Sequence, residues 1–184
     1  FPIKRESSNT LTIVIESLAG LGVFLIISTF LLSYLSPQSL IATGVVGSAQ
    51  SIFQLLSTTT PLLAGNKFLT FLGWALLVPL IETIFFNGRL LEGFAAYAES
   101  LTGKKISLES VSLGLIFVVL VIAALFTAFH FSAKGITTST PLIITFIFSV
   151  ISSILVLRHR ETRGAVVMHM AVNGAAVASL FKWI

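Results

Sequence analysis

Cysteine and aspartate are both missing from this chain of 184 residues. Without cysteine there can be no disulfide framework and no thiolate metal site, and the redox compartment cannot be inferred. Without aspartate, an intramembrane protease that uses a pair of aspartates is excluded. Charged residues make up only 10% of the chain, and no basic stripe with interleaved aromatic residues occurs. Binding to nucleic acid is therefore not expected.

Apolar side chains are abundant: they make up 55% of the residues, and the mean hydropathy is +1.02. A soluble domain of this length rarely needs so much apolar surface, whereas a bundle of membrane-spanning helices does. The expected fold is all-α, a polytopic transmembrane helical bundle of five or six helices. No internal repeat or low-complexity linker is visible, so residues 1–184 are expected to form a single transmembrane domain.

Five apolar runs approach the roughly 20 residues that a spanning helix needs. These runs are Leu11–Leu35, Pro61–Phe86, Val111–Phe131, Pro141–Leu157 and Gly164–Phe181. The fourth run is short and is expected to be extended by Thr137–Thr140, and the second is expected to continue as a helix through Leu90–Tyr97. The segment Ser39–Leu56 is rich in Ser, Thr, Gln and Gly, and it is left open as a polar span, a re-entrant piece or an interfacial helix.

The loop charges predict the orientation in the lipid bilayer. With five spans, one side carries Lys4, Arg5, Arg89, Lys104, Lys105, Arg158, Arg160 and Arg163, and the other carries Lys67, Lys134 and Lys182. The five spans predict an integral, multi-pass membrane protein. The positive-inside rule then predicts that its amino terminus is cytoplasmic. A further span at Ser39–Leu56 would separate Lys4 and Arg5 from the other basic residues of their group, which argues against it.

Ionisable side chains inside apolar runs mark candidate functional positions, because placing them in a membrane costs a few kcal/mol. Glu82, His130 and His169 are such residues. Glu16 is expected to snorkel to the interface, and His159, within RHRETR, is expected to lie in a solvated loop without a role.

The position of Asn173 adds a fourth polar group to this set. It follows His169 by four residues, so both side chains should share one face of a helix. Helix geometry permits Glu82, His130 and His169 to converge, but it does not require them to do so.

Three short motifs resemble those of the CPBP family, which contains CAAX prenyl proteases of type II and bacteriocin-processing intramembrane endopeptidases. The stretch Glu82–Gly88 resembles the first motif, Glu-Glu-x-x-x-Arg. Phe126-x-x-x-His130 resembles the second motif, and His169-x-x-x-Asn173 the third. The motifs occur in the family order on successive hydrophobic runs. The resemblance implies a family-like core at about residues 61–182, preceded by a transmembrane helix at residues 11–35.

The resemblance also implies an activity, the hydrolysis of a peptide bond within the membrane. Glu82 and His130 would activate a water, while His169 and Asn173 would stabilise the oxyanion. A positioned carboxylate and imidazole suit proton transfer from water, and polar donors in a dry site suit an oxyanion. Implied substrates are peptides or lipidated peptides.

The first motif departs from the family pattern. Thr83 replaces the second glutamate and Asn87 replaces the arginine, while Arg89 lies about 200° further around an α-helix and cannot substitute for it. The departures motivate an alternative to the peptidase, a catalytically silent relative that acts as a membrane scaffold, assembly factor or immunity factor with a membrane-protein partner.

Other interpretations of the polar residues stay open. Glu82 could be a structural hydrogen-bonding anchor between helices, or the three ionisable residues could form a proton or ion relay. Glu82, His130 and His169 could also supply the ligands of a catalytic zinc site. The His-Glu-x-x-His sequence of helical zinc peptidases is absent, so zinc is not predicted and metal use is left open.

Overall fold

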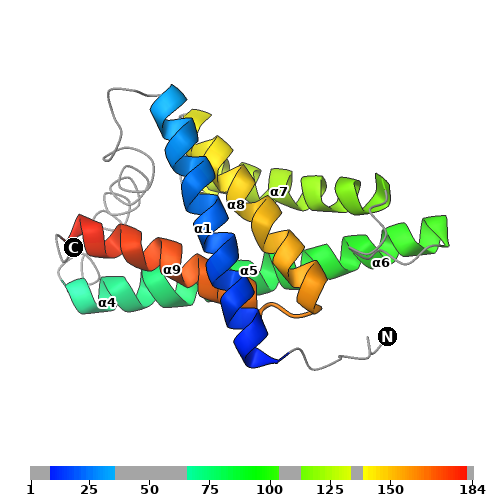
Figure 1. The fold of residues 1–184 in the computed structure, drawn as a ribbon, viewed down its shortest axis with the longest axis horizontal. Coiled ribbons are helices and arrows are strands. Elements are labelled where there is room, and N and C mark those ends of the chain that lie inside the picture. Colours follow the sequence, from blue (N-terminus) through cyan, green and yellow to red (C-terminus); the bar gives the residue numbers. More distant parts are fainter. Residues whose placement is uncertain (1–8, 36–65, 104–112, 134–138, 182–184) are drawn as a thin grey trace.

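The computed structural model describes residues 9–35, 66–103, 113–133 and 139–181. Within these ranges all the regular structure is helical (Figure 1). Helix α1 covers Thr10–Leu35, α7 covers Leu113–Ala133, α8 covers Ser139–His159 and α9 covers Arg163–Leu180. A further rod runs from residue 67 to residue 102. The predicted all-α class is confirmed, and the segment Ser39–Leu56 lies outside the described residues.

The rod consists of successive α-helical and π-helical segments. These are α4 (Lys67–Phe71), the π-helix η1 (Leu72–Leu77), α5 (Val78–Thr83), the π-helix η2 (Ile84–Leu90) and α6 (Leu91–Thr102). Asn66 caps the start, since its side chain accepts hydrogen bonds from the backbone N–H groups of Phe68 and Leu69. Gly103 ends the rod in the left-handed conformation, with φ of 65°. The predicted helical continuation through Leu90–Tyr97 is thus confirmed.

Pro79 gives a physical reason for the π-helical segment η1 that precedes it. A proline has no N–H, and inside an α-helix its ring clashes with the carbonyl four residues earlier. A π turn pairs each N–H with the carbonyl five residues back, and the N–H of Val78 bonds the carbonyl of Gly73 in this way. In the same register the carbonyl of Trp74 would face position 79, where no N–H exists. Trp74 can therefore accept a hydrogen bond from another helix.

Four helical stretches among the described residues are long and apolar enough to cross a membrane. They are Thr10–Leu31, Lys67–Thr102, Leu113–Ser132 and Leu142–His159. Helix α9 forms where a helix was predicted. It is not among these four stretches, and its 18 residues include Arg163, His169 and Asn173. The cytoplasmic position of the amino terminus stays a prediction.

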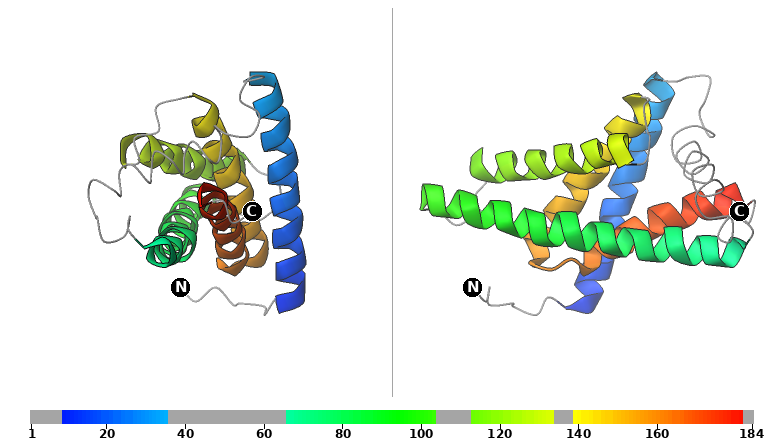
Figure 2. Two further views of the ribbon diagram at one scale, coloured as in Figure 1. Left: turned by 90° about the vertical axis from the view of Figure 1, so that its left-hand side faces the viewer. Right: turned by 180° about the vertical axis from the view of Figure 1, so that it is seen from behind.

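The rod is flanked by different helices along its length (Figures 1 and 2). Helix α9 lies along α4 and α5, and α7 lies along α6, while α1 and α8 cross beside them. Two apolar clusters fill the interior: one surrounds Leu91 and Ile122, and the other surrounds Phe126 and Met168. This arrangement brings the middle of the rod against both α7 and α9.

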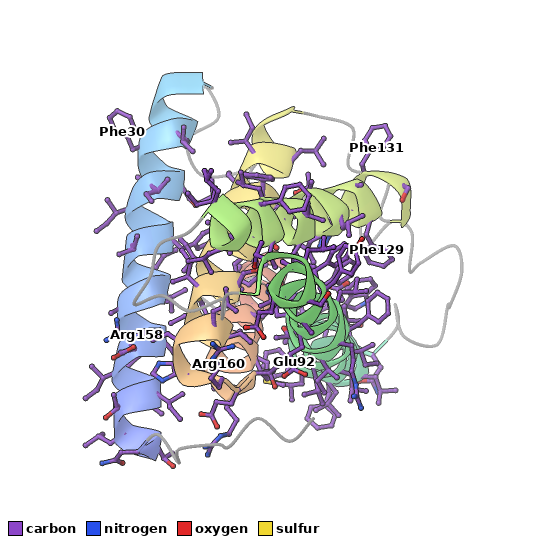
Figure 3. The ribbon with its side chains drawn as sticks, turned by 90° about the vertical axis from the view of Figure 1, so that its right-hand side faces the viewer. Phe30, Glu92, Phe129, Phe131, Arg158 and Arg160 are labelled. Atoms are coloured by element: carbon purple, nitrogen blue, oxygen red, sulfur yellow. The ribbon has the colours of Figure 1, made fainter. Side chains whose placement is uncertain are left out.

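The outer surface of the helices is apolar over much of its area. Phe30 on α1 and Phe131 on α7 point away from the other helices in Figure 3, and both are exposed. The charged residues Glu92, Arg158 and Arg160 lie toward the other end of the same view. Exposed aromatic and aliphatic side chains on such helices are suited to contact with lipid.

Helix α1 is joined to the end of α8 by a contact of Glu16, and the position of His159 there corrects a sequence-based expectation. Glu16 Oε2 lies 2.6 Å from Nε of Arg158 and 2.9 Å from Nε2 of His159. His159 is buried rather than solvated, because α8 continues to this residue before the chain turns at Arg160, which has a φ of 54°. Glu16 is thus paired with a neighbouring helix, and its position at the membrane interface stays a prediction.

Gly164 is expected to be essential for the close approach of α9 to α1. An added Cβ would lie 2.7 Å from Ser17 Oγ and 3.3 Å from Ile13 Cγ2. Ser17 cannot easily move, because its hydroxyl donates to the Ile13 carbonyl at 2.6 Å. Gly164→Ala should therefore lower the free energy of unfolding in micelles by about 1–2 kcal/mol. Gly22→Ala is the control, since nothing lies within 4 Å of its added Cβ; equal effects of the two changes would contradict the packing.

Candidate active site

The candidate site is centred on Glu82, which lies near the end of α5, just before the π-helix η2. Its side chain is buried, with 7% exposed. Thr83, Phe86 and Asn87 are buried on the same side of the rod. Short π-helical segments occur frequently at functional sites, and here one stands on each side of α5. The rod therefore directs a carboxylate toward the neighbouring helices α7 and α9.

His130 approaches Glu82 from the last part of α7. Its Nδ1 lies 2.9 Å from the carbonyl oxygen of Phe126, four residues earlier. Its Nε2 lies 3.9 Å from Oε2 of Glu82. The backbone contact thus orients the ring so that its other nitrogen faces the carboxylate.

His169 approaches the same carboxylate from α9. Its Nε2 lies 3.6 Å from Oε2 of Glu82, and its Nδ1 lies 3.1 Å from Oγ1 of Thr83. Two histidines and a glutamate, which are distant in sequence and come from three helices, thus converge on one buried point.

Aromatic rings surround this polar group. The ring of Phe126 lies 4.3 Å from that of His130 and 5.9 Å from that of His169, centre to centre. Phe148 lies 4.7 Å from His169, and Phe86 lies 5.1 Å from Phe126. Apolar rings lower the local dielectric constant, so interactions between the charged and polar groups are stronger than in water.

Asn173 is not brought into contact with Glu82. Its Nδ2 donates to the carbonyl oxygen of Trp74 at 3.1 Å. This is the carbonyl that, in the π register, faces the missing N–H of Pro79. The structure therefore places Asn173 one turn beyond His169, on the same helix, and ties its amide to the rod.

The two departures from the family motif both make contacts between helices. Thr83 contacts His169, and the amide Nδ2 of Asn87 donates to Oγ of Ser153 on α8 at 3.0 Å. Arg89 is exposed and takes no part in these contacts. Sequence reasoning identified the replacements but missed both partners. The one available signal was the pair Ser152-Ser153, two hydroxyl groups within an apolar run.

Glu82, His130 and His169 have side chains of the kinds that bind metal ions. Within residues 9–35, 66–103, 113–133 and 139–181, no group of three or more His, Cys, Asp or Glu side chains has an arrangement that could hold one. The chemistry available from the described residues is that of a carboxylate, two imidazoles and nearby amide and hydroxyl groups.

The fold and this site together define a class, that of helical membrane proteins with a glutamate and two histidines buried between helices. A family model described as type II CAAX prenyl endopeptidase Rce1-like matches residues 64–175, which is more than half of the chain, and the chain belongs to this family. The resemblance seen in the three motifs is thereby confirmed. No curated protein and no solved structure matches the chain.

Proposed function

We propose that this protein is an intramembrane endopeptidase that hydrolyses a peptide bond with a water activated by Glu82 and His130. The observation that carries the proposal is the approach of both histidines to a single carboxylate oxygen inside an apolar bundle. Burying three ionisable side chains in a membrane protein is costly. A catalytic role gives a physical reason for that cost, whereas packing alone would be served better by apolar residues.

The spacing between Glu82 and His130 supports a shared water. At 3.9 Å the carboxylate oxygen and Nε2 are too far apart for a direct hydrogen bond. Two hydrogen bonds of about 2.8 Å that meet at roughly a right angle span about 4 Å. The water oxygen would attack the substrate carbonyl carbon, one water proton would pass to Glu82 or His130, and that proton would then go to the leaving amine.

His169 and Asn173 are proposed to stabilise the negative oxygen of the tetrahedral intermediate. Both residues can offer N–H groups from the same face of α9. One N–H of the Asn173 amide is used by Trp74, and the second is proposed to donate to the oxyanion. A fixed donor of this kind is typically worth about a hundredfold to a thousandfold in kcat.

Peptides with a lipidated carboxyl terminus are the proposed substrate class, in keeping with the family description. The test is incubation of the purified protein in lipid vesicles with prenylated and unprenylated peptide libraries in ¹⁸O-water, followed by mass spectrometry. We expect one cleavage site per substrate and ¹⁸O in the new carboxyl group.

The matched variants are His130→Gln and His159→Gln, which make the same chemical change at two buried histidines. His130→Gln should lower the rate by about 10²–10⁴, and His159→Gln should retain the wild-type rate in the folded fraction. Absence of cleavage of every peptide by folded wild-type protein would overturn the proposal and favour the scaffold interpretation, which the Thr83 and Asn87 replacements support.

A further inference from the structure

The hydrogen bonds of the two histidines determine which ring nitrogen of each carries the proton. For His130 the assignment is direct. Its Nδ1 faces the carbonyl oxygen of Phe126 at 2.9 Å, and a carbonyl can only accept. In the neutral ring Nδ1 must therefore carry the proton, so Nε2 presents a lone pair toward Glu82.

His169 has a different partner at Nδ1, the hydroxyl group of Thr83 at 3.1 Å. Thr83 is buried, with 1% exposed. Among the described residues its hydroxyl has no hydrogen-bond partner other than this nitrogen. If Nδ1 carried the proton, the hydroxyl hydrogen would have no acceptor there, and a buried unsatisfied donor costs about 1–3 kcal/mol. The hydroxyl is therefore the donor and Nδ1 the acceptor.

We propose that Thr83 is a positioning residue whose hydroxyl donates to Nδ1 of His169 and so fixes the tautomer in which Nε2 carries the proton. The inference rests on the proposed peptidase function for its catalytic meaning. In this arrangement Nε2 of His169 is a donor and Nε2 of His130 is an acceptor, both facing Glu82.

Because Nε2 of His130 accepts a hydrogen bond and Nε2 of His169 donates one, the two histidines can take different roles in the reaction. An acceptor next to a carboxylate can help to remove a proton from water, as proposed for His130. A donor can bond first the carboxylate and then a developing oxyanion, as proposed for His169. Thr83 occupies the position of the second glutamate of the family motif, and its hydroxyl supplies a neutral donor to His169 there.

The test compares Thr83→Val, which keeps the shape but removes the hydroxyl, with Thr83→Ser, which keeps the hydroxyl. We expect Thr83→Val to lower kcat by about 10- to 100-fold, less than the loss of an oxyanion donor itself, with KM changed by less than about twofold. Thr83→Ser should recover most of the rate. Equal losses in the two variants, or no loss in Thr83→Val, would overturn the positioning role.

A second readout needs no substrate. In protein with ¹⁵N-labelled histidine, the nitrogen spectrum should show His169 with a protonated Nε2 and an unprotonated Nδ1, and His130 with the reverse pattern. His169→Gln and His130→Gln assign the signals. Thr83→Val should move only the signals of His169 toward the other tautomer. A protonated Nδ1 on His169 in the wild-type protein would contradict the inference.

The two proposals can fail separately. If Glu82→Gln cleaves peptides as fast as the wild type, the peptidase mechanism fails, whatever the tautomer of His169. If Glu82→Gln is inactive but Thr83→Val matches the wild type in both kcat and nitrogen spectrum, the mechanism stands and only the role of Thr83 is lost.

Discussion

Replacement of Glu82 by glutamine is expected to lower kcat for peptide hydrolysis by about 10³-fold or more. The change keeps the size of the side chain and its carbonyl oxygen but removes its capacity to take a proton from water. A positioned general base contributes typically 10²–10⁴-fold, and both histidines face the same oxygen of Glu82. The loss should appear in kcat rather than in KM, because the carboxylate acts on the water and not on the bound peptide.

The measurement is a single-turnover cleavage rate in lipid vesicles for wild type, Glu82→Gln and Glu92→Gln. Glu92 lies further along the same rod, on the exposed side of α6 (Figure 3), so it tests the loss of one negative charge outside the site. The Glu92→Gln variant should cleave the peptide at the wild-type rate. Equal rates for all three proteins would contradict catalysis by Glu82.

Stability data on the same variants separate a catalytic role from a structural one. A buried carboxylate that serves only as an inter-helix anchor contributes to folding, so its replacement should change the unfolding free energy. A catalytic carboxylate held at some cost can be replaced by its amide with little change or a gain in stability, as in other strained or polar active sites. We expect the unfolding free energy of Glu82→Gln to be equal to or higher than that of the wild type.

The helices could be predicted from the sequence because their apolar runs are long and continuous. Leu11–Leu35 and Val111–Phe131 each contain enough apolar residues for one span, and α1 and α7 lie where these runs predict them. The position of His159 could not be predicted in this way. Its burial depends on the continuation of α8 to this residue and on the approach of Glu16, which is distant in sequence.

The candidate site could be predicted in part. Glu82, His130 and His169 were identifiable because ionisable residues are rare in apolar runs. Their convergence could not be deduced, because the spacing of residues along single helices does not determine how the helices pack against one another. The partners of Thr83 and Asn87 could not be deduced, because each π turn adds a residue and rotates the next part of the helix by about 100° relative to an α-helix. A prediction based on α-helical phase therefore loses register on both sides of α5.

Replacement of Phe126 by alanine is expected to lower the free energy of unfolding by about 2–3 kcal/mol. Phe126 is 2% exposed, and its ring contacts Phe86 as well as both histidines of the site. Loss of a buried Phe in a soluble core costs about 3–5 kcal/mol. In a bilayer the unfolded helix keeps its ring in lipid, so little transfer free energy is lost and the cavity accounts for most of the effect.

Phe117→Ala is the matched control, because Phe117 lies on the same helix with 62% of its surface exposed. It should change the unfolding free energy in micelles or vesicles by less than about 0.5 kcal/mol. Equal effects of the two changes would show that Phe126 is not packed at the centre of the bundle. The carbonyl of residue 126 remains in Phe126→Ala, so the bond to Nδ1 of His130 is kept. Any loss of kcat in the folded variant would therefore report the packing of the rings that hold the two histidines against Glu82.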